Sequence, residues 1–335
     1  MPGISDHRLT RDKISHFLAQ HSPLIIFGTL CLVFALVSPA FRSTASLQQI
    51  PVRTATIAIM AIGELLVILT AGIDLSVGSV AALAGVAGCL TMTAEPLQGA
   101  LGLGGAVPVV CGVLAGSGVG LLCGIINGFN TAKLRIPAFI STLGMMMGAR
   151  GVARLLTEGQ TVRGFPEAFA WLGGGESWLV PAGLSLAVAV LVALILGFTP
   201  FGRALYAIGG NREAARLSGL AVDRVRIAAF AISGTCAGFT GMIIASRVNV
   251  AAVNAAETYE LDAIAACVIG GASLMGGEGG SIATLAGALI IIVLRKFCTL
   301  NGWDENWQLV IVGLLVIILV CYDNWRKRRA GLLKD

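Results

Sequence analysis

Two carboxylic acids, Glu64 and Asp74, lie in a stretch of sequence that is otherwise apolar enough to sit in a lipid bilayer. Residues 71–79 read Ala-Gly-Ile-Asp-Leu-Ser-Val-Gly-Ser and interrupt its helical pattern. A helix break at membrane depth is tolerated only where protein or a water-filled path covers the exposed backbone. Ionisable groups at that depth are functional candidates by default. We therefore expect five residues to line or gate a solute path: Glu64, Asp74, Ser76, Gly78 and Ser79.

The residue types leave two roles open for these polar side chains. Asp74 could bind solute hydroxyl groups, or it could accept hydrogen bonds from backbone N–H groups that the break leaves free. Asn127 could face the same path or bridge two helices, and bridging is the commoner use of Asn inside membranes. Glu260 and Asp262 point to different faces of a helix, so we expect at most one of them to face the path.

The composition indicates an integral membrane protein. The chain has 335 residues, of which 56% are hydrophobic and 12% charged, and its mean hydropathy is +0.87. A soluble domain carries about twice that charged fraction. We predict an all-α transmembrane helix bundle of about ten spans, with broken helices. The expected spans are residues 23–40, 54–72, 77–93, 107–131, 138–156, 179–198, 228–246, 259–275, 282–297 and 307–322.

The placement of Lys and Arg predicts the orientation. If the chain begins in the cytoplasm, most basic residues fall in cytoplasmic connections, as the positive-inside rule requires. Both termini are then cytoplasmic, and the apolar segment after residue 22 is an uncleaved first span rather than a signal peptide. We expect a cytoplasmic segment 1–22, a transmembrane domain 23–322 that includes a cytoplasmic loop 199–227, and a basic cytoplasmic tail 323–335. Residues 41–53 are expected to be a short polar connection.

An internal repeat supports this architecture. Residues 78–85 and 280–287 are identical at six of eight positions, and each copy follows a glycine-rich break that carries an acid, Asp74 or Glu278. Internal repeats with discontinuous helices build the binding sites of many transporters. We predict a parallel repeat, in which a second break at residues 276–280 lines or gates the same path as the first.

The loop 199–227 contains a short helical pattern of its own. Asn211 is a suitable N-cap for this helix, and Gly219 is a suitable end. The simplest interpretation is a solvated surface helix. However, a short rigid helix with one charge-poor face, in the largest basic cytoplasmic loop, is also suited to docking a soluble motor protein.

Three motifs carry a family resemblance. Glu213-Ala214-Ala215 followed by Gly219 resembles the E-A-A-x-x-x-G loop of permease subunits in bacterial ABC importers. Residues 66–79, 210–219 and 259–266 resemble motifs of the ribose-type sugar permeases. The likeness extends from about residue 50 to the last expected span. Two departures are the missing Leu-Pro pair after Gly219 and the acid at position 64, where ribose permeases carry an uncharged residue.

The resemblance implies an assembly in the bacterial inner membrane. Such permeases pair with a second permease chain, either an identical copy or a paralogue, within the membrane lipid. They receive sugar from a periplasmic sugar-binding protein and are driven by an ABC ATPase with two nucleotide-binding cassettes. The residues expected to couple to that ATPase are Gly210, Asn211, Glu213, Ala214, Arg216 and Gly219.

The expected function is therefore translocation of a monosaccharide by an ABC importer permease. A polyol, a signalling sugar derivative or a nucleoside is an alternative solute. A proton-coupled carrier with Glu64 or Asp74 as the relay is an alternative mechanism. The sequence contains no G-x-x-x-x-G-K-[ST] phosphate loop, so we expect ATP to be used by a partner.

No other chemistry is indicated by the sequence. We find no nucleophile–base pair and no cofactor loop, so we expect neither an enzyme nor a cofactor. All three histidines precede residue 22, and the cysteines form no C-x-x-C pair, so no metal site is expected. No basic stripe alternates with aromatic residues, so nucleic acid is not an expected partner.

Overall fold

The computed structural model describes residues 23–95, 106–175 and 177–329 of the chain. Over these residues the protein is helical, and extended pairing is confined to one antiparallel bridge between Val162 and Ala251. The helices are α2 (Thr44–Leu69), α3 (Val77–Thr93), α5 (Ala106–Ala132), α6 (Ala138–Thr157), the 3-10 helix η1 (Glu167–Trp171), α7 (Leu179–Phe198), α8 (Pro200–Gly210), α9 (Arg212–Leu217), α10 (Val222–Val248), α11 (Tyr259–Ile269), α12 (Ser281–Leu300) and α13 (Glu305–Arg329).

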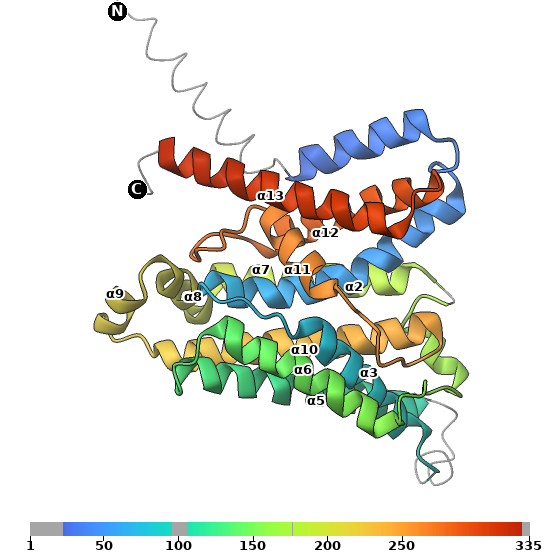
Figure 1. Cartoon of the computed structure of the whole chain (residues 1–335), viewed down its shortest axis with the longest axis horizontal. Helices are drawn as coiled ribbons and strands as arrows, with labels where there is room; N and C mark the ends of the chain where they lie inside the picture. Colours follow the sequence, from blue (N-terminus) through green and yellow to red (C-terminus); the bar gives the residue numbers. More distant parts are fainter. Residues whose placement is uncertain (1–22, 96–105, 176, 330–335) are drawn as a thin grey trace, which may run out of the picture.

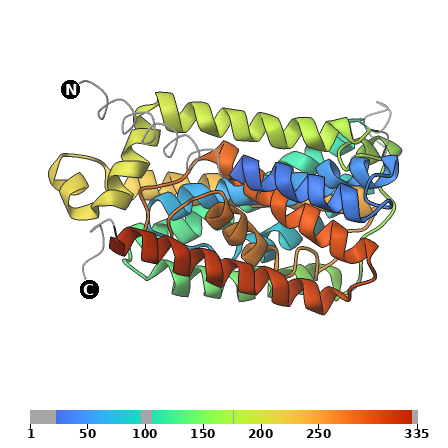
Figure 2. The same ribbon diagram turned by 90° about the horizontal axis from the view of Figure 1, so that it is seen from above.

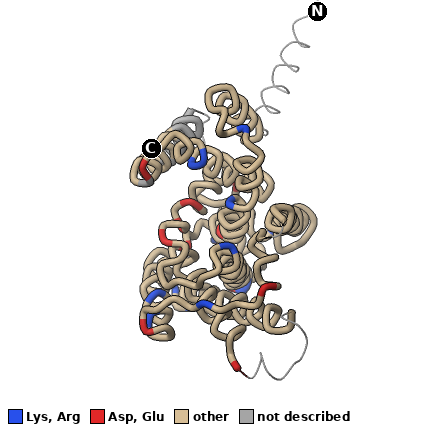
Figure 3. Tube along the Cα trace, turned by 90° about the vertical axis from the view of Figure 1, so that its right-hand side faces the viewer, with Lys and Arg blue, Asp and Glu red and all other residues tan. Residues whose placement is uncertain are grey.

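The helices have the length and composition of a membrane-embedded bundle. Within the described residues, α2, α5, α7, α10 and α12 are each long and apolar enough to cross a bilayer. Shorter apolar helices lie at Pro23–Val37, in α3 and at Asn306–Leu315. The long helices run side by side along the molecule (Figures 1 and 2), and little of the end-on trace in Figure 3 is charged. The all-α fold of an integral membrane protein agrees with the sequence prediction.

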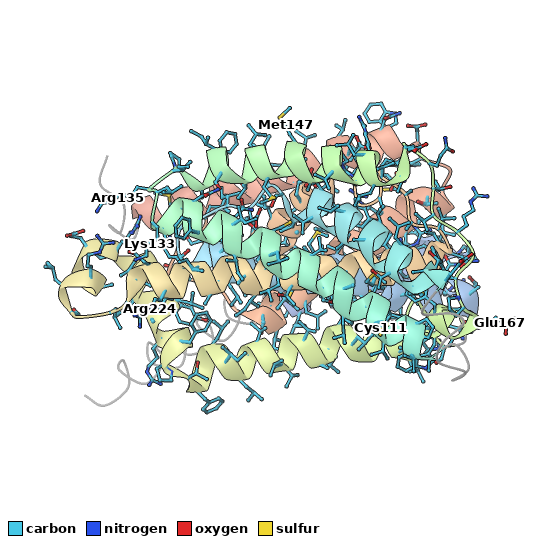
Figure 4. The ribbon with its side chains drawn as sticks, turned by 90° about the horizontal axis from the view of Figure 1, so that it is seen from below. Cys111, Lys133, Arg135, Met147, Glu167 and Arg224 are labelled. Carbon is cyan, nitrogen blue, oxygen red and sulfur yellow. The ribbon has the colours of Figure 1, made fainter. Side chains whose placement is uncertain are left out.

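The bundle has two distinct ends. The α8–α9 pair projects from one end, which we call the α9 end, and the C-terminal part of α13 points the same way (Figures 1 and 2). Lys133, Arg135 and Arg224 lie at the α9 end, whereas Cys111 and Glu167 lie at the opposite end (Figure 4).

The packing of α5 against α10 depends on glycine. A Cβ atom added at Gly120 of α5 would lie 2.1 Å from the carbonyl oxygen of Gly234 in α10, and one at Gly124 would lie 2.2 Å from that of Phe230. These distances leave no room for a side chain, so the two backbones are in contact. Small residues allow this close approach between helices in membranes.

Helix α2 forms the centre of the bundle. Every residue from Thr54 to Leu69 is buried, and α2 contacts α7, α10, α11 and α12. An apolar helix that is buried on all sides must be surrounded by other helices rather than by lipid. Consequently α2, which ends at the first break, is held firmly by its neighbours.

The sequence prediction of helix boundaries was partly wrong. The apolar segment 179–198 matches α7 at both ends. In contrast, most of the expected connection 41–53 is helical, because the Ser43 side chain caps α2 and the helix continues through Pro51. The expected eighth span is also shorter, because α11 ends at Ile269 and the chain to Gly280 is not helical.

Candidate functional site

The first break, residues 70–76, is held by its own polar side chains. The carboxylate of Glu64 accepts a 2.8 Å hydrogen bond from the backbone N–H of Asp74. Asp74 in turn accepts from the backbone N–H of Ser76 at 2.9 Å and from its hydroxyl at 2.5 Å. Ser79 donates to the carbonyl of Ser76 at 2.8 Å. The two acids therefore replace the backbone partners that a continuous helix would have supplied.

Asparagine and serine side chains extend this network to α5 and α6. The amide of Asn127 donates to the Ser76 hydroxyl at 3.0 Å, and its carbonyl accepts from Ser141 at 3.2 Å. Asn130 also donates to Ser141, at 3.2 Å. Glu64, Ser79 and Asn127 have no exposed surface in this single chain. The helix-bridging interpretation of Asn127 therefore agrees with its contacts.

One atom of this network has no partner. The Oε2 atom of Glu64 is buried without a hydrogen bond to any described group. An unpaired charged oxygen in such a place is costly.

The two acids of α11 have separate environments, as their spacing predicted. Asp262 is buried and forms a 2.7 Å ion pair with Arg295 of α12. The Glu260 side chain instead lies against Gly78, where an added Cβ would be 2.3 Å from its Oε2 atom. Glu260 thus meets the start of α3, whereas Asp262 ties α11 to α12. No sequence motif marks Arg295 as this partner, although a buried acid in an apolar helix requires a cation nearby.

The second break, residues 270–280, contacts the first. The backbone N–H of Gly277 donates a 3.0 Å hydrogen bond to the carbonyl of Leu69, the last residue of α2. Gly276 and Gly277 have φ angles of +89° and +77°, a region that side chains rarely adopt. The Tyr206 hydroxyl of α8 donates to the carbonyl of Gly279 at 2.8 Å. Both breaks therefore meet at one place, next to α8.

Gly209 closes the contact between α8 and the two breaks. A Cβ atom at Gly209 would lie 2.0 Å from the carbonyl oxygen of Leu69 and 2.2 Å from the nitrogen of Gly277. A Cβ at the next residue, Gly210, would have no atom within 4 Å. The backbone of α8 thus touches both breaks at a single residue, which the sequence motifs did not identify.

Helix α9 has the caps that the sequence predicted. The Asn211 side chain accepts from the backbone N–H of Ala214 at 2.9 Å, and Gly219 follows the helix with a φ angle of +84°. Ala215 packs against Ile208 and Val222, whereas Glu213, Ala214 and Arg216 are exposed. Leu217 is 82% exposed, a high value for a leucine outside the apolar bundle.

An acid that belongs to none of the sequence motifs fixes α9 to the bundle. Asp223, in the first turn of α10, pairs with Arg216 at 3.1 Å and with Lys133 at 3.3 Å. Lys133 follows α5, so these two ion pairs join α9, α10 and α5 at the α9 end. Within the described residues no group of three or more His, Cys, Asp and Glu side chains could hold a metal ion.

Comparison with known proteins places these features in a family. A family model described as "Branched-chain amino acid transport system / permease component" matches residues 46–320. The ribose import permease protein of Escherichia coli K12 is 37% identical over 314 residues, which cover 92% of this chain and 94% of that protein. No solved structure matches the chain.

Two further relatives are named for other sugars. The fructose import permease protein of Rhizobium meliloti is 34% identical over 337 residues, 95% of this chain and 90% of that protein. The L-arabinose transport system permease protein of Escherichia coli K12 is 35% identical over 311 residues, 92% of each chain.

Proposed function

Because this chain belongs to the family of branched-chain amino acid transport system permease components, we propose that it is the membrane permease of an ABC importer for a monosaccharide. One observation carries the choice of solute. Relatives that are named for ribose, fructose and L-arabinose each match more than nine-tenths of this chain. A five- or six-carbon sugar is therefore the favoured solute, even though the family model is named for amino acids.

The arrangement of the chain in the membrane is part of this proposal. Ten spans would place α9 and the C-terminal end of α13 on the cytoplasmic side, where the basic residues gather. The parallel repeat is supported by the near-identical sequences that begin α3 and α12, because each of these helices follows a break. Residues 1–22 and 323–335 would then be cytoplasmic, on either side of the permease domain 23–322.

Helix α9 is the proposed contact with a separate ABC ATPase. Its exposed residues Glu213, Ala214 and Arg216 would bind the ATPase, and the capping residues Asn211 and Gly219 would fix the helix. Movement of α9 would pass through α8 to Gly209, which touches the carbonyl of Leu69 and the nitrogen of Gly277. A docking helix would thereby be joined directly to both breaks, which gate the path in this proposal.

The polar residues around the first break would act as one unit in this gate. Glu64, Asp74, Ser76, Ser79 and Asn127 are buried and hydrogen-bonded within the chain. A gate that moves as a rigid piece needs such internal bonds. Glu260 against Gly78, and Asp262 with Arg295, would connect to it the helices α11 and α12, which flank the second break. A periplasmic sugar-binding protein and a second permease chain would complete the importer.

The function is tested by purification and by uptake. The tagged chain is extracted gently from its own membrane, and the proteins that accompany it are identified by mass spectrometry. We expect an ATPase with two nucleotide-binding cassettes in fixed ratio, and either one or two kinds of permease chain.

Uptake of labelled ribose, fructose and L-arabinose is then compared with that of leucine in cells with and without the gene. We expect gene-dependent uptake of at least one sugar, which stops when ATP is depleted. Uptake of leucine alone would overturn the sugar assignment. Sugar uptake that survives ATP depletion and stops when the proton gradient is removed would overturn the importer assignment.

A further inference from the structure

A pocket of about 370 Å³ opens at the end of the bundle opposite to α9. Helices α10 and α12 end there and α13 begins there (Figure 1). Six of the lining residues are basic or aromatic: Arg53, Arg247, Arg295, Lys296, Tyr259 and Trp303. Four cations from three different helices therefore share one pocket.

Only one of these cations has an acidic partner among the described residues. Arg295 pairs with Asp262, and its Nε atom is buried without a hydrogen bond. Lys296 donates to the neutral Gln49 side chain at 2.7 Å. Among the described residues, the neighbouring acids Glu257 and Glu260 form no ion pair with any of these four cations. The described part of the pocket thus carries an excess of positive charge.

The basic pocket at the other end differs in this respect. Its volume is about 410 Å³, and its charged lining residues are Lys133, Arg216, Arg224 and Asp223. Asp223 pairs with two of those cations. Two of the three cations in that pocket thus share an acidic partner, whereas three of the four cations around Arg53 have none among the described residues. Like charges held together repel one another, and an anion from outside would remove that repulsion.

We propose that the pocket around Arg53 binds a phosphate group. Guanidinium groups hold phosphate through two parallel hydrogen bonds, and a lysine ammonium adds a point charge. Trp303, which is 50% exposed, and Tyr259 have the amphipathic rings that favour the membrane surface. The phosphate could belong to the headgroup of an anionic lipid or to a free solute.

The test compares Arg53→Gln and Lys296→Gln with Arg163→Gln. Glutamine removes one charge and retains much of the side-chain length. Arg163 is an exposed arginine in the connection between α6 and α7 and does not line the pocket, so its replacement removes one charge elsewhere. Arg295 is left intact because its loss would leave Asp262 buried without a partner. Size-exclusion chromatography in detergent confirms that each variant folds.

Binding is measured as a rise in unfolding temperature during two titrations. One titration adds inorganic phosphate, and its control adds sodium chloride to the same ionic strength. The other uses nanodiscs of phosphatidylcholine with increasing phosphatidylglycerol. We expect Arg53→Gln and Lys296→Gln to weaken binding by about tenfold or more, because each loses a charge-assisted hydrogen bond. Arg163→Gln should match the wild type.

The two titrations distinguish the sources of the phosphate. A response to phosphatidylglycerol alone identifies a lipid headgroup, and a response to inorganic phosphate alone identifies a free anion. A response to both shows that the group itself is recognised. No response to either, or an equal loss in Arg163→Gln, overturns the proposal, and an acidic surface of a partner protein would then be the occupant to test.

Discussion

The backbone N–H of Gly277 donates a hydrogen bond of 3.0 Å to the carbonyl of Leu69. This bond joins the second break to the end of α2, and therefore to the first break. Gly209 of α8 lies against both groups, so close that no side chain fits. The three residues belong to distant parts of the sequence. Their contact gives the α8–α9 pair a direct mechanical connection to both interruptions in the bundle.

We expect Gly209→Ala to reduce sugar uptake by about tenfold or more, because a methyl group would collide with Leu69 and Gly277. Inserting one carbon into a fully packed contact typically costs about 1–3 kcal/mol. The matched control is Gly197→Ala, which adds the same methyl group to the neighbouring helix α7, where it would meet no atom within 4 Å. The measurement is uptake per molecule of permease in the membrane.

Copurification of the ATPase separates two explanations for that loss. If Gly209 transmits movement, the ATPase stays bound to Gly209→Ala and only uptake falls. Normal uptake by Gly209→Ala would show that this contact is not used in transport. Equal losses in Gly209→Ala and Gly197→Ala would attribute the effect to the added methyl group in a helix rather than to the contact with the breaks.

We predict that Gly219→Val weakens binding of the ATPase, whereas Gly219→Asn retains it. Gly219 has a φ angle of +84°, and a Cβ there would meet no other atom. The change therefore acts through backbone conformation alone. A β-branched residue is destabilised by about 1–2 kcal/mol in this left-handed backbone conformation, whereas Asn adopts the conformation more readily. Copurified ATPase per permease is the readout, and equal binding by both variants would contradict a conformational role for Gly219.

The sequence was sufficient to predict the features that depend on neighbouring residues. The N-cap at Asn211, the turn at Gly219 and the limits of α7 were all predicted correctly. Local features of this kind follow from capping, backbone sterics and hydropathy. For Asn127 the sequence left two roles open, facing the path or bridging helices, and its hydrogen bonds to Ser76 and Ser141 are those of a bridging residue.

Features that depend on the three-dimensional arrangement could not be read from the sequence. Residues 44–53 are polar and contain Pro51, yet they continue α2. The early end of α11 at Ile269 follows from the second break, which hydropathy does not reveal. The contacts of Gly209 with Leu69 join residues that no local pattern relates. Pairing information from many related sequences would be needed to predict such contacts.

We expect Arg295→Gln to lower the free energy of unfolding by about 3–5 kcal/mol, because it leaves Asp262 buried without its partner. The double variant Asp262→Asn with Arg295→Gln should lose less free energy of unfolding than the two single variants lose together. The control is Arg216→Gln, which breaks the exposed pair with Asp223. We expect it to lower the free energy of unfolding by about 1 kcal/mol or less. Thermal unfolding in detergent measures all four variants, and strictly additive losses would show that the buried pair is not coupled.

The last prediction separates the importer from the proton-coupled carrier. Glu64→Gln preserves the oxygen that accepts from the N–H of Asp74 but cannot release a proton. We expect this variant to retain at least half of the wild-type uptake, because in an importer Glu64 supports the first break and the ATPase supplies the energy. Glu64→Met should lose uptake, since the buried N–H of Asp74 then has no partner, at a cost of about 1–3 kcal/mol. A Glu64→Gln protein that folds and binds the ATPase but transports nothing would instead assign proton transfer to Glu64.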